Sequence, residues 1–373
     1  MFGRIKLDAI SPARVGFDYS KLKARNLVKL DANEVEFFDE KLKLIAADAL
    51  MHCDLGRYPD PNSTEVRNLI AADLNIPTDS IVVGNGSDEL LNNIFFAFFG
   101  MKVMIPDISY PVYYHLANLN EMKIHKINLT KNYDLPDDID NQVKEFNPNI
   151  IFLSYPNNPT GTLFNRKAIV RMIDRFPETV FVIDEAYYEF CEKTFIEYAF
   201  SRPNVIILRT FSKIFSLAGL RVGYAIAGNA ILDLLLKTKL IYSVSGVSQA
   251  IICALHPKIK EHISFVRDSI ISERKLYEKK LSNLFTTPAA KGSANFVFVP
   301  IPENLDYKKI EKSLHAQNIF IRFMPYDDAG VFLRFSLGLP ENNKRAYESL
   351  ERLILDQKKG EIDAVTNKRE NTS

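Results

Sequence analysis

The sequence contains little cysteine, and its few cysteines are not spaced for a metal site or a disulfide framework. Only three occur in 373 residues, Cys53, Cys191 and Cys253, and no two of them form a CxxC pair. A thiolate zinc site needs such pairs, and small disulfide-stabilised domains need more cysteines. We therefore expect three buried, reduced thiols. The six histidines show no metal spacing such as HExxH either, so no metal is predicted.

Net charge is also nearly absent. The 47 lysines and arginines are matched by 46 aspartates and glutamates, which leaves a formal net charge of +1. Proteins that bind nucleic acid gather basic residues to meet the phosphates. A balanced chain without basic blocks therefore predicts that nucleic acid is not a partner. The apolar fraction of 47% in turn excludes a chain that is disordered throughout.

No long apolar run is present. The most apolar window, residues 94–99, is far shorter than the roughly 18 residues of a membrane-spanning helix, and we expect it on the buried face of a helix. The first residues carry Arg4, Lys6 and Asp8 where a secretory signal would have an apolar core. The prediction is a cytoplasmic protein that has no membrane as partner.

What the sequence does contain is an alternation of short β-branched runs with longer helical stretches. The runs are apolar on successive residues, as expected for strands of a sheet that is covered on both faces. Strand–helix alternation predicts an α/β fold with a mostly parallel mixed sheet between helices. The predicted strands are residues 81–83, 102–105, 150–153, 180–183, 205–208 and 224–227.

Two domains and a tail are predicted. The large domain covers residues 45–255, and a smaller α+β domain covers residues 256–356, beginning with a long, charged amphipathic helix. Residues 1–44 are expected to join the small domain, which then consists of both ends of the chain. The polar residues 357–373 are predicted to be a disordered tail.

The residues after one predicted strand indicate a covalently held cofactor. Thr210, Ser212 and Lys213 follow the run 205–208, at the carboxyl end of a strand, where ligands gather in open α/β sheets. Two hydroxyls together with the guanidinium of Arg221 can hold a phosphate. Alone, Lys213 would be read as a surface residue. A lysine beside a phosphate site is typical of a Schiff base to pyridoxal 5'-phosphate.

That cofactor needs a carboxylate to keep its pyridine nitrogen protonated, and Asp184 ends the preceding predicted strand. Tyr187, three residues later, and Asn158, in the string PNNPTG at residues 156–161, can each hydrogen-bond the cofactor's phenolic oxygen. Alternatives remain for two of these features. Asp184 is also a suitable helix N-cap, and PNNPTG has the composition of a turn.

Two further segments can contact the same cofactor. The string GNGSDE at residues 84–89 opens a helix after a strand, so the backbone amides of Ser87 and Asp88 can bind a phosphate. An ordinary N-cap is compatible with this, whereas a dinucleotide loop would need a third glycine. Tyr110, just past a strand, can stack on a planar ring or pack in the core.

Together these motifs resemble the fold-type I pyridoxal-phosphate aminotransferases of class I/II, and among them most the histidinol-phosphate aminotransferase branch. The resemblance extends from about residue 30 to residue 355, with the motifs in the family's order and spacing. The matching strings are LDANE at 30–34, RYPD at 57–60, GNGSDE at 84–89, PNNPTG at 156–161, DEAYYEF at 184–190, TFSK at 210–213, AGLRVGY at 218–224, SANFVFV at 293–299 and LRFSLG at 333–338.

The resemblance implies a role for each matching residue. Lys213 would form the Schiff base and carry a proton between the substrate carbon and the cofactor, and Tyr58 would reach the cofactor phosphate from the partner subunit of a homodimer with shared sites. Arg334 and Arg322 would bind the substrate's anionic groups together with Asn33; for the arginines, surface ion pairs are the alternative. The other implied cofactor contacts are Asp184, Tyr187, Asn158, Tyr110, Thr210, Ser87, Asp88, Ser212 and Arg221.

Two departures from the family pattern fall on the substrate side. The Pro-Tyr-x-Pro-Gly segment of this branch is replaced by residues 12–16, PARVG, so its tyrosine is absent, and Arg14 or Tyr19 would have to replace it. The usual Asn-Glu-Asn-Pro becomes NEVE at residues 33–36. The cofactor motifs are intact, so the sequence defines the cofactor more closely than the substrate.

The predicted activity is amino-group transfer, in amino-acid biosynthesis, between glutamate/2-oxoglutarate and a small phosphorylated amine or keto compound. A decarboxylase of phosphothreonine or phosphoserine is the alternative, because it would use the same cofactor residues. A regulator without catalytic activity would be expected to carry an added DNA-binding domain, for which no residues are spare. A nicotinamide dehydrogenase is supported only by the incomplete glycine loop.

Overall fold

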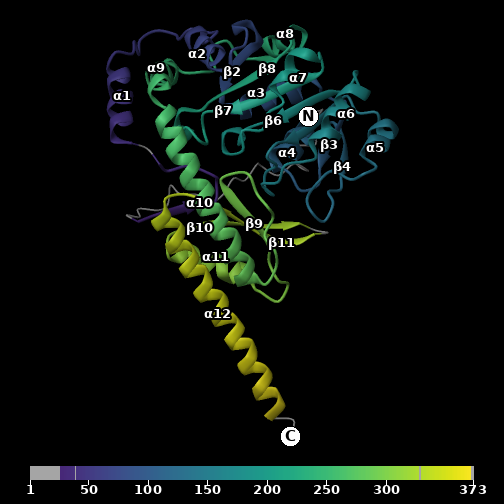
Figure 1. Cartoon of the computed structure of the whole chain (residues 1–373), viewed down its shortest axis with the longest axis vertical. Coiled ribbons are helices and arrows are strands. Elements are labelled where there is room, and N and C mark those ends of the chain that lie inside the picture. Colours follow the sequence, from purple (N-terminus) through teal and green to yellow (C-terminus); the bar gives the residue numbers. More distant parts are fainter. Residues whose placement is uncertain (1–25, 38, 327–328, 371–373) are drawn as a thin grey trace, which may run out of the picture. The chain divides into compact units, whose positions relative to one another are not determined.

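The structure is a computed structural model that describes residues 26–37, 39–326 and 329–370 (Figure 1). The chain divides into two compact units. In the described part, the first unit comprises Phe37–Ser269 with Gly292–Ala294, and the second comprises residues 26–36, Ile270–Lys291 and the chain from residue 295 onward. The divisions therefore lie before residue 37 and inside a long helix, where the sequence analysis placed them after residues 44 and 255.

A mixed sheet forms the centre of the first unit, which confirms the predicted fold class. Among the described residues it has seven strands, and all of them run parallel except β8, which is antiparallel to both of its neighbours. In spatial order the strands are β2 (Ile81–Asn85), β8 (Val222–Ala227), β7 (Val205–Thr210), β6 (Val180–Asp184), β5 (Ile150–Ser154), β3 (Lys102–Pro106) and β4 (Lys123–Ile127).

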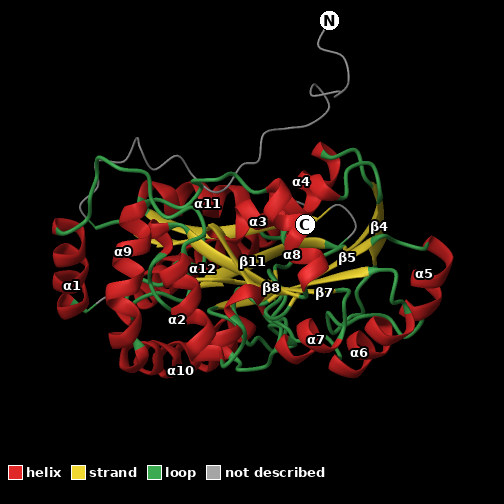
Figure 2. Cartoon of the chain, turned by 90° about the horizontal axis from the view of Figure 1, so that it is seen from above, coloured by secondary structure: helices red, strands yellow, loops and turns green. Residues whose placement is uncertain are grey.

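Helices cover both faces of this sheet. Ile151 and Leu153 of β5 pack in one core with α6 and α7, while Ile150 and Phe152 pack in another with α3 and α4, on the opposite side of the strands (Figure 2). Both faces are apolar, which explains the continuous apolar runs in the sequence. The helices of this unit are α1 (Glu40–Met51), α2 (Thr64–Leu74), α3 (Gly86–Ala97), α4 (Pro111–Leu119), α5 (Ile139–Phe146), α6 (Arg166–Arg175), α7 (Ile196–Ser201), α8 (Asn229–Thr238) and α9 (Gly246–Leu255).

Two expectations about burial are wrong in part. Of the apolar window 94–99, Ile94 and Phe95 of α3 are buried, but Phe96 is 62% and Phe99 is 50% exposed. Phe96 follows the buried residues on the same helix and turns away from the core, and Phe99 lies beyond the end of the helix at Ala97. The three cysteines are free thiols but only half-buried. No helix in the described ranges is long and apolar enough to cross a membrane, and no group of His, Cys, Asp or Glu there is arranged to hold a metal ion.

The second unit contains a smaller sheet of four strands, as far as the described residues show, in which only β1 and β10 pair in parallel. Helix α10 (Lys260–Phe285) begins in the first unit and ends in the second. The order of the strands is β1 (Val28–Leu30), β10 (Ile319–Tyr326), β11 (Gly330–Ser336) and β9 (Phe296–Pro300), and the remaining helices are α11 (Tyr307–Ala316) and α12 (Pro340–Glu370).

The predicted tail begins as part of α12. This helix continues through Gln357 to Glu370, a segment that contains no proline to break it. The side-chain amide of Gln357 accepts a hydrogen bond from the backbone N–H of Asp306 at 3.1 Å and donates one to its carbonyl at 3.2 Å. The ammonium of Lys358 donates to the carbonyl of Leu284. Residues 357 and 358 are therefore packed against the second unit.

Candidate functional site

The carboxyl ends of β5, β6 and β7 bring the predicted cofactor residues to one edge of the first sheet. Ser154 and Asp184 are paired at the ends of β5 and β6, and Asp184 is paired with Leu208 of β7. After β7 the chain turns sharply, because Thr210 Oγ1 accepts a hydrogen bond from the backbone N–H of Ser212 at 3.0 Å and donates one to its hydroxyl. This turn carries Lys213 toward the end of β6.

Lys213, Tyr187 and Asp184 lie together at this edge. The ammonium nitrogen of Lys213 is 5.6 Å from the ring centre of Tyr187. Burial raises the pKa of the Asp184 carboxyl to about 6, while a hydrogen bond and the positive charge of Lys213 act in the opposite direction. An amine, a phenol and a buried carboxylate are thus close enough to act on one small ligand.

The Asp184 carboxylate receives one donor on each oxygen. The hydroxyl of Tyr113 donates to Oδ2 at 2.6 Å, and the backbone N–H of Ala186 donates to Oδ1 at 3.0 Å. The second bond is the local turn contact expected of an N-capping aspartate, although no α-helix begins here. A carboxylate has about four acceptor positions, so Asp184 can still accept a further donor.

Tyr113 is a site residue that sequence reasoning missed. Tyr110 is the N-cap of α4 and Tyr113 lies three residues further on, so the two rings meet edge to face with centres 5.5 Å apart. The Tyr110 hydroxyl donates to Asp88 at 3.3 Å. The spacing of three residues on a helix was the available signal, but only the packing shows that Tyr113 reaches Asp184.

Arg221, Ser212 and the first residues of α3 form a corner whose shape and donors suit an anion, named here the anion-binding corner. Arg221 donates from Nη1 to the hydroxyl of Ser212 at 3.2 Å and from Nη2 to Asp88 at 3.1 Å. Its guanidinium lies against Gly86, where an added Cβ would be 2.5 Å from Nη2, and a Cβ on Gly223 would be 2.3 Å from the backbone nitrogen of Ser87. The two glycines therefore let the guanidinium and the first amides of α3 converge, as a bound phosphate requires.

The PNNPTG segment forms a tight turn held by Asn157. Its side-chain amide donates to the carbonyl of Ile108 at 2.9 Å and to the hydroxyl of Thr160 at 3.0 Å, and Gly161 adopts a positive φ of 73°. The turn interpretation is therefore correct for Asn157. Asn158, the residue predicted to contact the cofactor, is buried next to it.

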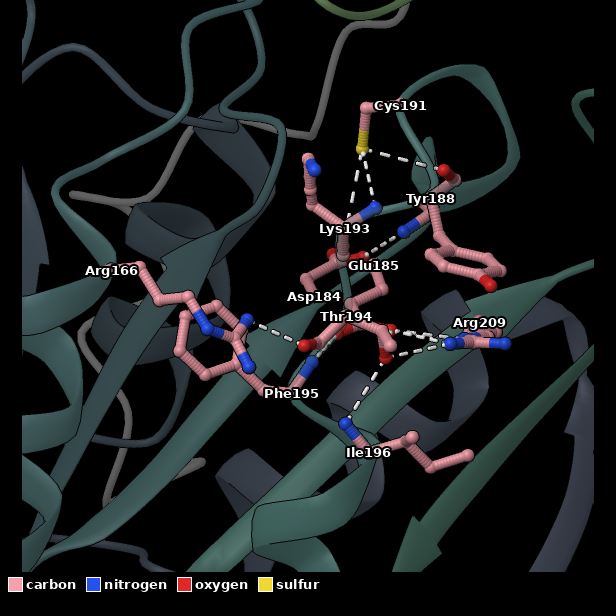
Figure 3. A network of polar contacts seen from close by, with 11 residues as sticks. Arg166, Asp184, Glu185, Tyr188, Cys191, Lys193, Thr194, Phe195, Ile196 and Arg209 are labelled. Atoms are coloured by element: carbon pink, nitrogen blue, oxygen red, sulfur yellow. Dashed lines mark hydrogen bonds and ion pairs between the residues drawn. The ribbon is translucent and has the colours of Figure 1, made fainter.

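A buried ion pair adjoins Asp184 on the opposite face of the sheet. Glu185 and Arg209 are 0% and 2% exposed, and the guanidinium donates from both Nε, at 3.0 Å, and Nη2, at 2.8 Å, to Glu185 Oε2 (Figure 3). Thr194 donates to the same oxygen and accepts from Nη2. The guanidinium also lies 3.7 Å from the ring centre of Tyr188. This network joins the ends of β6 and β7.

The other predicted residues are placed elsewhere in the chain. Tyr58 is 80% exposed in the first unit and stacks on Tyr242, with ring centres 4.5 Å apart. Arg322 and Arg334 are paired across β10 and β11 in the second unit, and Arg334 donates to the carbonyl of Asp31. The Asn33 side chain accepts from the hydroxyl of Ser336 at 2.8 Å. Arg14 and Tyr19 lie outside the described residues.

The sequence and the fold of this chain are similar to those of known proteins. Residues 25–350 match the family described as aminotransferase class I and II. The histidinol-phosphate aminotransferase of Hydrogenobaculum sp. is 32% identical over 333 residues, which cover 87% of this chain and 93% of the relative.

Solved structures of similar fold include the histidinol-phosphate aminotransferase of Sinorhizobium meliloti in complex with pyridoxal-5'-phosphate. It has a TM-score of 0.81 and 23% identity, and the match covers 89% of this chain and 92% of that one. The L-threonine-O-3-phosphate decarboxylase of Porphyromonas gingivalis has a TM-score of 0.72 and 20% identity, and the match covers 88% of this chain and 99% of that one. At these identities the likeness concerns the fold alone.

Proposed function

Because the chain belongs to the class I and II aminotransferase family and is a pyridoxal-phosphate-dependent aminotransferase, we propose that it moves an amino group between glutamate/2-oxoglutarate and a small phosphorylated amine or its keto partner. Histidinol phosphate is the first compound to test, since it names the relatives that match most of the chain. The observation that carries the proposal is the meeting of Lys213, Asp184 and the anion-binding corner in one unit.

The residues present fit the cofactor. Asp184 is a buried carboxylate with acceptor capacity to spare, and two glycines leave room for Arg221 and the first amides of α3. When bound, pyridoxal phosphate supplies an electron sink for a bond at the substrate's amine-bearing carbon. We assign its pyridine nitrogen to Asp184 and its phosphate to the corner formed by Arg221 and Ser212, with the amides of Ser87 and Asp88.

Each of the chain's own site residues then has a proposed role. Lys213 takes the proton from the substrate carbon at its Nζ and returns one. Tyr187 and Asn158 hydrogen-bond the phenolic oxygen, and Tyr110 stacks on the ring. Thr210 shapes the turn that presents Ser212 and Lys213, through its bonds to Ser212.

Three residues of the second unit are proposed to bind the substrate's anionic groups. Arg322 and Arg334 extend from neighbouring strands in register, and a pair of guanidiniums suits a carboxylate or a phosphate because each can bind it through two parallel hydrogen bonds. Asn33 belongs to the same unit and is anchored by Ser336. These assignments rest on the family resemblance together with this pairing.

The substrate assignment predicts strong dependence on a phosphate group. With 2-oxoglutarate as acceptor, histidinol phosphate should form glutamate with a kcat/KM at least about 100-fold higher than histidinol, because charge-assisted hydrogen bonds to the phosphate are lost in the latter. Steady-state measurement of glutamate with both amines checks this. Equal rates would contradict a phosphate-specific site. Release of carbon dioxide from phosphothreonine without any keto acid would instead support the decarboxylase.

We also propose a homodimer in which Tyr58 serves the partner's site. Tyr58 belongs to an exposed apolar surface, and its stacking on Tyr242 holds it there. Apolar residues that lie close to these two tyrosines in the sequence are also exposed, namely Met51 at 82%, Leu55 at 73%, Leu240 at 72% and Ile241 at 67%. Exposed apolar residues grouped in this way are typical of a protein–protein interface.

Mixed dimers test the shared site. Tyr58→Ala and Lys213→Ala homodimers should each be nearly inactive, but dimers formed by co-expressing the two chains should regain about a quarter of the wild-type activity, because half of them contain one site with both residues intact. Turnover per bound cofactor is the measurement. If Tyr58 served its own chain, every site of the mixed dimer would lack one residue and no activity would return.

A further inference from the structure

Tyr113 occupies a position between two residues that are proposed to contact the cofactor. Its side chain is fully buried, and its hydroxyl donates to Asp184 Oδ2 at 2.6 Å. Its ring meets Tyr110 edge to face at 5.5 Å and packs on Phe152 with ring centres 5.3 Å apart. Phe152 in turn stacks on Phe95 at 4.2 Å, so the tyrosine ring is held by the core between the sheet and helices α3 and α4.

The two donors to Asp184 are of different kinds. The N–H of Ala186 belongs to the same turn as Asp184 and moves with it. The Tyr113 hydroxyl comes from α4, a separate element packed on the sheet. A carboxylate held only by its own turn can rotate about its last side-chain bond, whose torsion is broad. The bond from Tyr113 removes this freedom.

We propose that Tyr113 is a positioning residue for the aminotransferase site: its hydroxyl fixes the orientation of the Asp184 carboxylate, and its ring supports Tyr110. One side chain of α4 thereby fixes the orientation of both Asp184 and Tyr110, which are proposed to contact the cofactor ring. The proposal rests on the proposed roles of Asp184 and Tyr110.

The same bond also favours the ionised form of Asp184. The pKa of Asp184 is raised to about 6 in total: burial raises it most, the Tyr113 hydroxyl, the Ala186 amide and Lys213 lower it, and Asp88 raises it. Burial raises the pKa of Tyr110 and Tyr113 well above the usual value, so these phenols stay neutral near pH 7. Tyr187 also interacts electrostatically with the Tyr110 hydroxyl. Loss of the Tyr113 hydroxyl therefore raises the pKa of Asp184.

This shift has a defined effect on stability in the cofactor-free chain. The pKa of Asp184 is higher in the folded protein than its ordinary value of 3.8. The contribution of Asp184 to the free energy of unfolding therefore falls as pH rises between 3.8 and about 6, and then levels off. Removing the donor extends the fall to higher pH. The Tyr113→Phe variant should therefore lose more stability, relative to wild type, at about pH 8 than at about pH 5.

The experiment compares urea midpoints of the full-length, cofactor-free chain at these two pH values. We expect the midpoint deficit of Tyr113→Phe to grow from about pH 5 to about pH 8, and to become independent of pH when Asp184→Asn is also present. In the holoenzyme, the cofactor dissociation constant should rise about tenfold and kcat should fall with little change in KM.

Tyr114→Phe is the matched control. It removes a hydroxyl from the next residue of the same helix, one that donates to the backbone carbonyls of Ile105 and Pro106. Its deficit should be the same at both pH values, and its cofactor affinity should stay at the wild-type level. A pH-independent deficit for Tyr113→Phe that persists with Asp184→Asn would overturn the proposal and leave a packing role.

The Asp184→Asn variant separates this inference from the proposed function. If that substitution alone leaves cofactor affinity unchanged, the assignment of Asp184 to the pyridine nitrogen is wrong. The pH dependence of Tyr113→Phe still reports the Tyr113–Asp184 bond in that case. A normal loss of affinity in Asp184→Asn, with no effect of Tyr113→Phe on either affinity or pH dependence, refutes the inference alone.

Discussion

Substitution of Lys213 by alanine is expected to lower kcat by at least about 10,000-fold while the chain still folds. Lys213 supplies the amine proposed to move the substrate's proton, and its Nζ lies 5.6 Å from the ring centre of Tyr187. Removing it takes away the chemistry and leaves the apolar core untouched. Steady-state glutamate formation and size-exclusion chromatography together measure both parts of the prediction.

One control variant and one rescue experiment accompany this prediction. Lys167→Ala on α6 removes an exposed lysine and should leave kcat within about twofold of wild type. Added small primary amines should restore part of the rate of Lys213→Ala, because a free amine can carry the proton that Nζ carries. Turnover of Lys213→Ala at the wild-type rate would exclude the proposed mechanism.

The largest stability effect is expected at the buried ion pair. Arg209→Met should cost about 4 kcal/mol of unfolding free energy, because it leaves the fully buried Glu185 without its cation. Glu189, whose pKa burial raises to about 7, faces the same guanidinium and loses it as well. Urea unfolding followed by circular dichroism measures the loss.

The loss should depend on pH in a defined direction. Burial already raises the pKa of Glu185, and without Arg209 the carboxyl becomes neutral more readily. The deficit of Arg209→Met should therefore be smaller at about pH 5 than at about pH 8. Arg171→Met provides the control, because Arg171 is half-exposed and its bond to Asp140 should contribute less than about 1 kcal/mol. Equal losses of unfolding free energy in the two variants would show that the buried pair contributes no more than the exposed one.

The central sheet was predictable because its strands are apolar on both faces. Alternate residues of β5 enter opposite cores, so the pattern of the sequence and the layers of the structure have the same cause. The positions of Lys213 and Asp184 followed from the same pattern, since parallel strands end at one edge of a sheet. Spacing after each strand was enough to predict that Lys213 and Asp184 meet there.

Other features depend on contacts between distant segments and could not be predicted from spacing. Glu185 and Arg209 form an ion pair because β6 and β7 are neighbours in a register that places both side chains on one face. Tyr113 has the same surroundings in the sequence as a core tyrosine, and only its approach to Asp184 gives it a polar role. Phe96 and Phe99 belong to an apolar window yet are exposed.

The sequence by itself determined the α/β class and the order of the cofactor motifs, because hydrophobic periodicity and turn composition act over a few residues. The tertiary structure alone decided which side chain from outside the turn holds Asp184 and which cation neutralises Glu185. These depend on strand order and helix packing, which join residues as far apart as 71 positions in the case of Tyr113 and Asp184. Short-range sequence patterns were enough to predict the candidate residues, whereas long-range packing determines how their side chains are oriented and which charges they face.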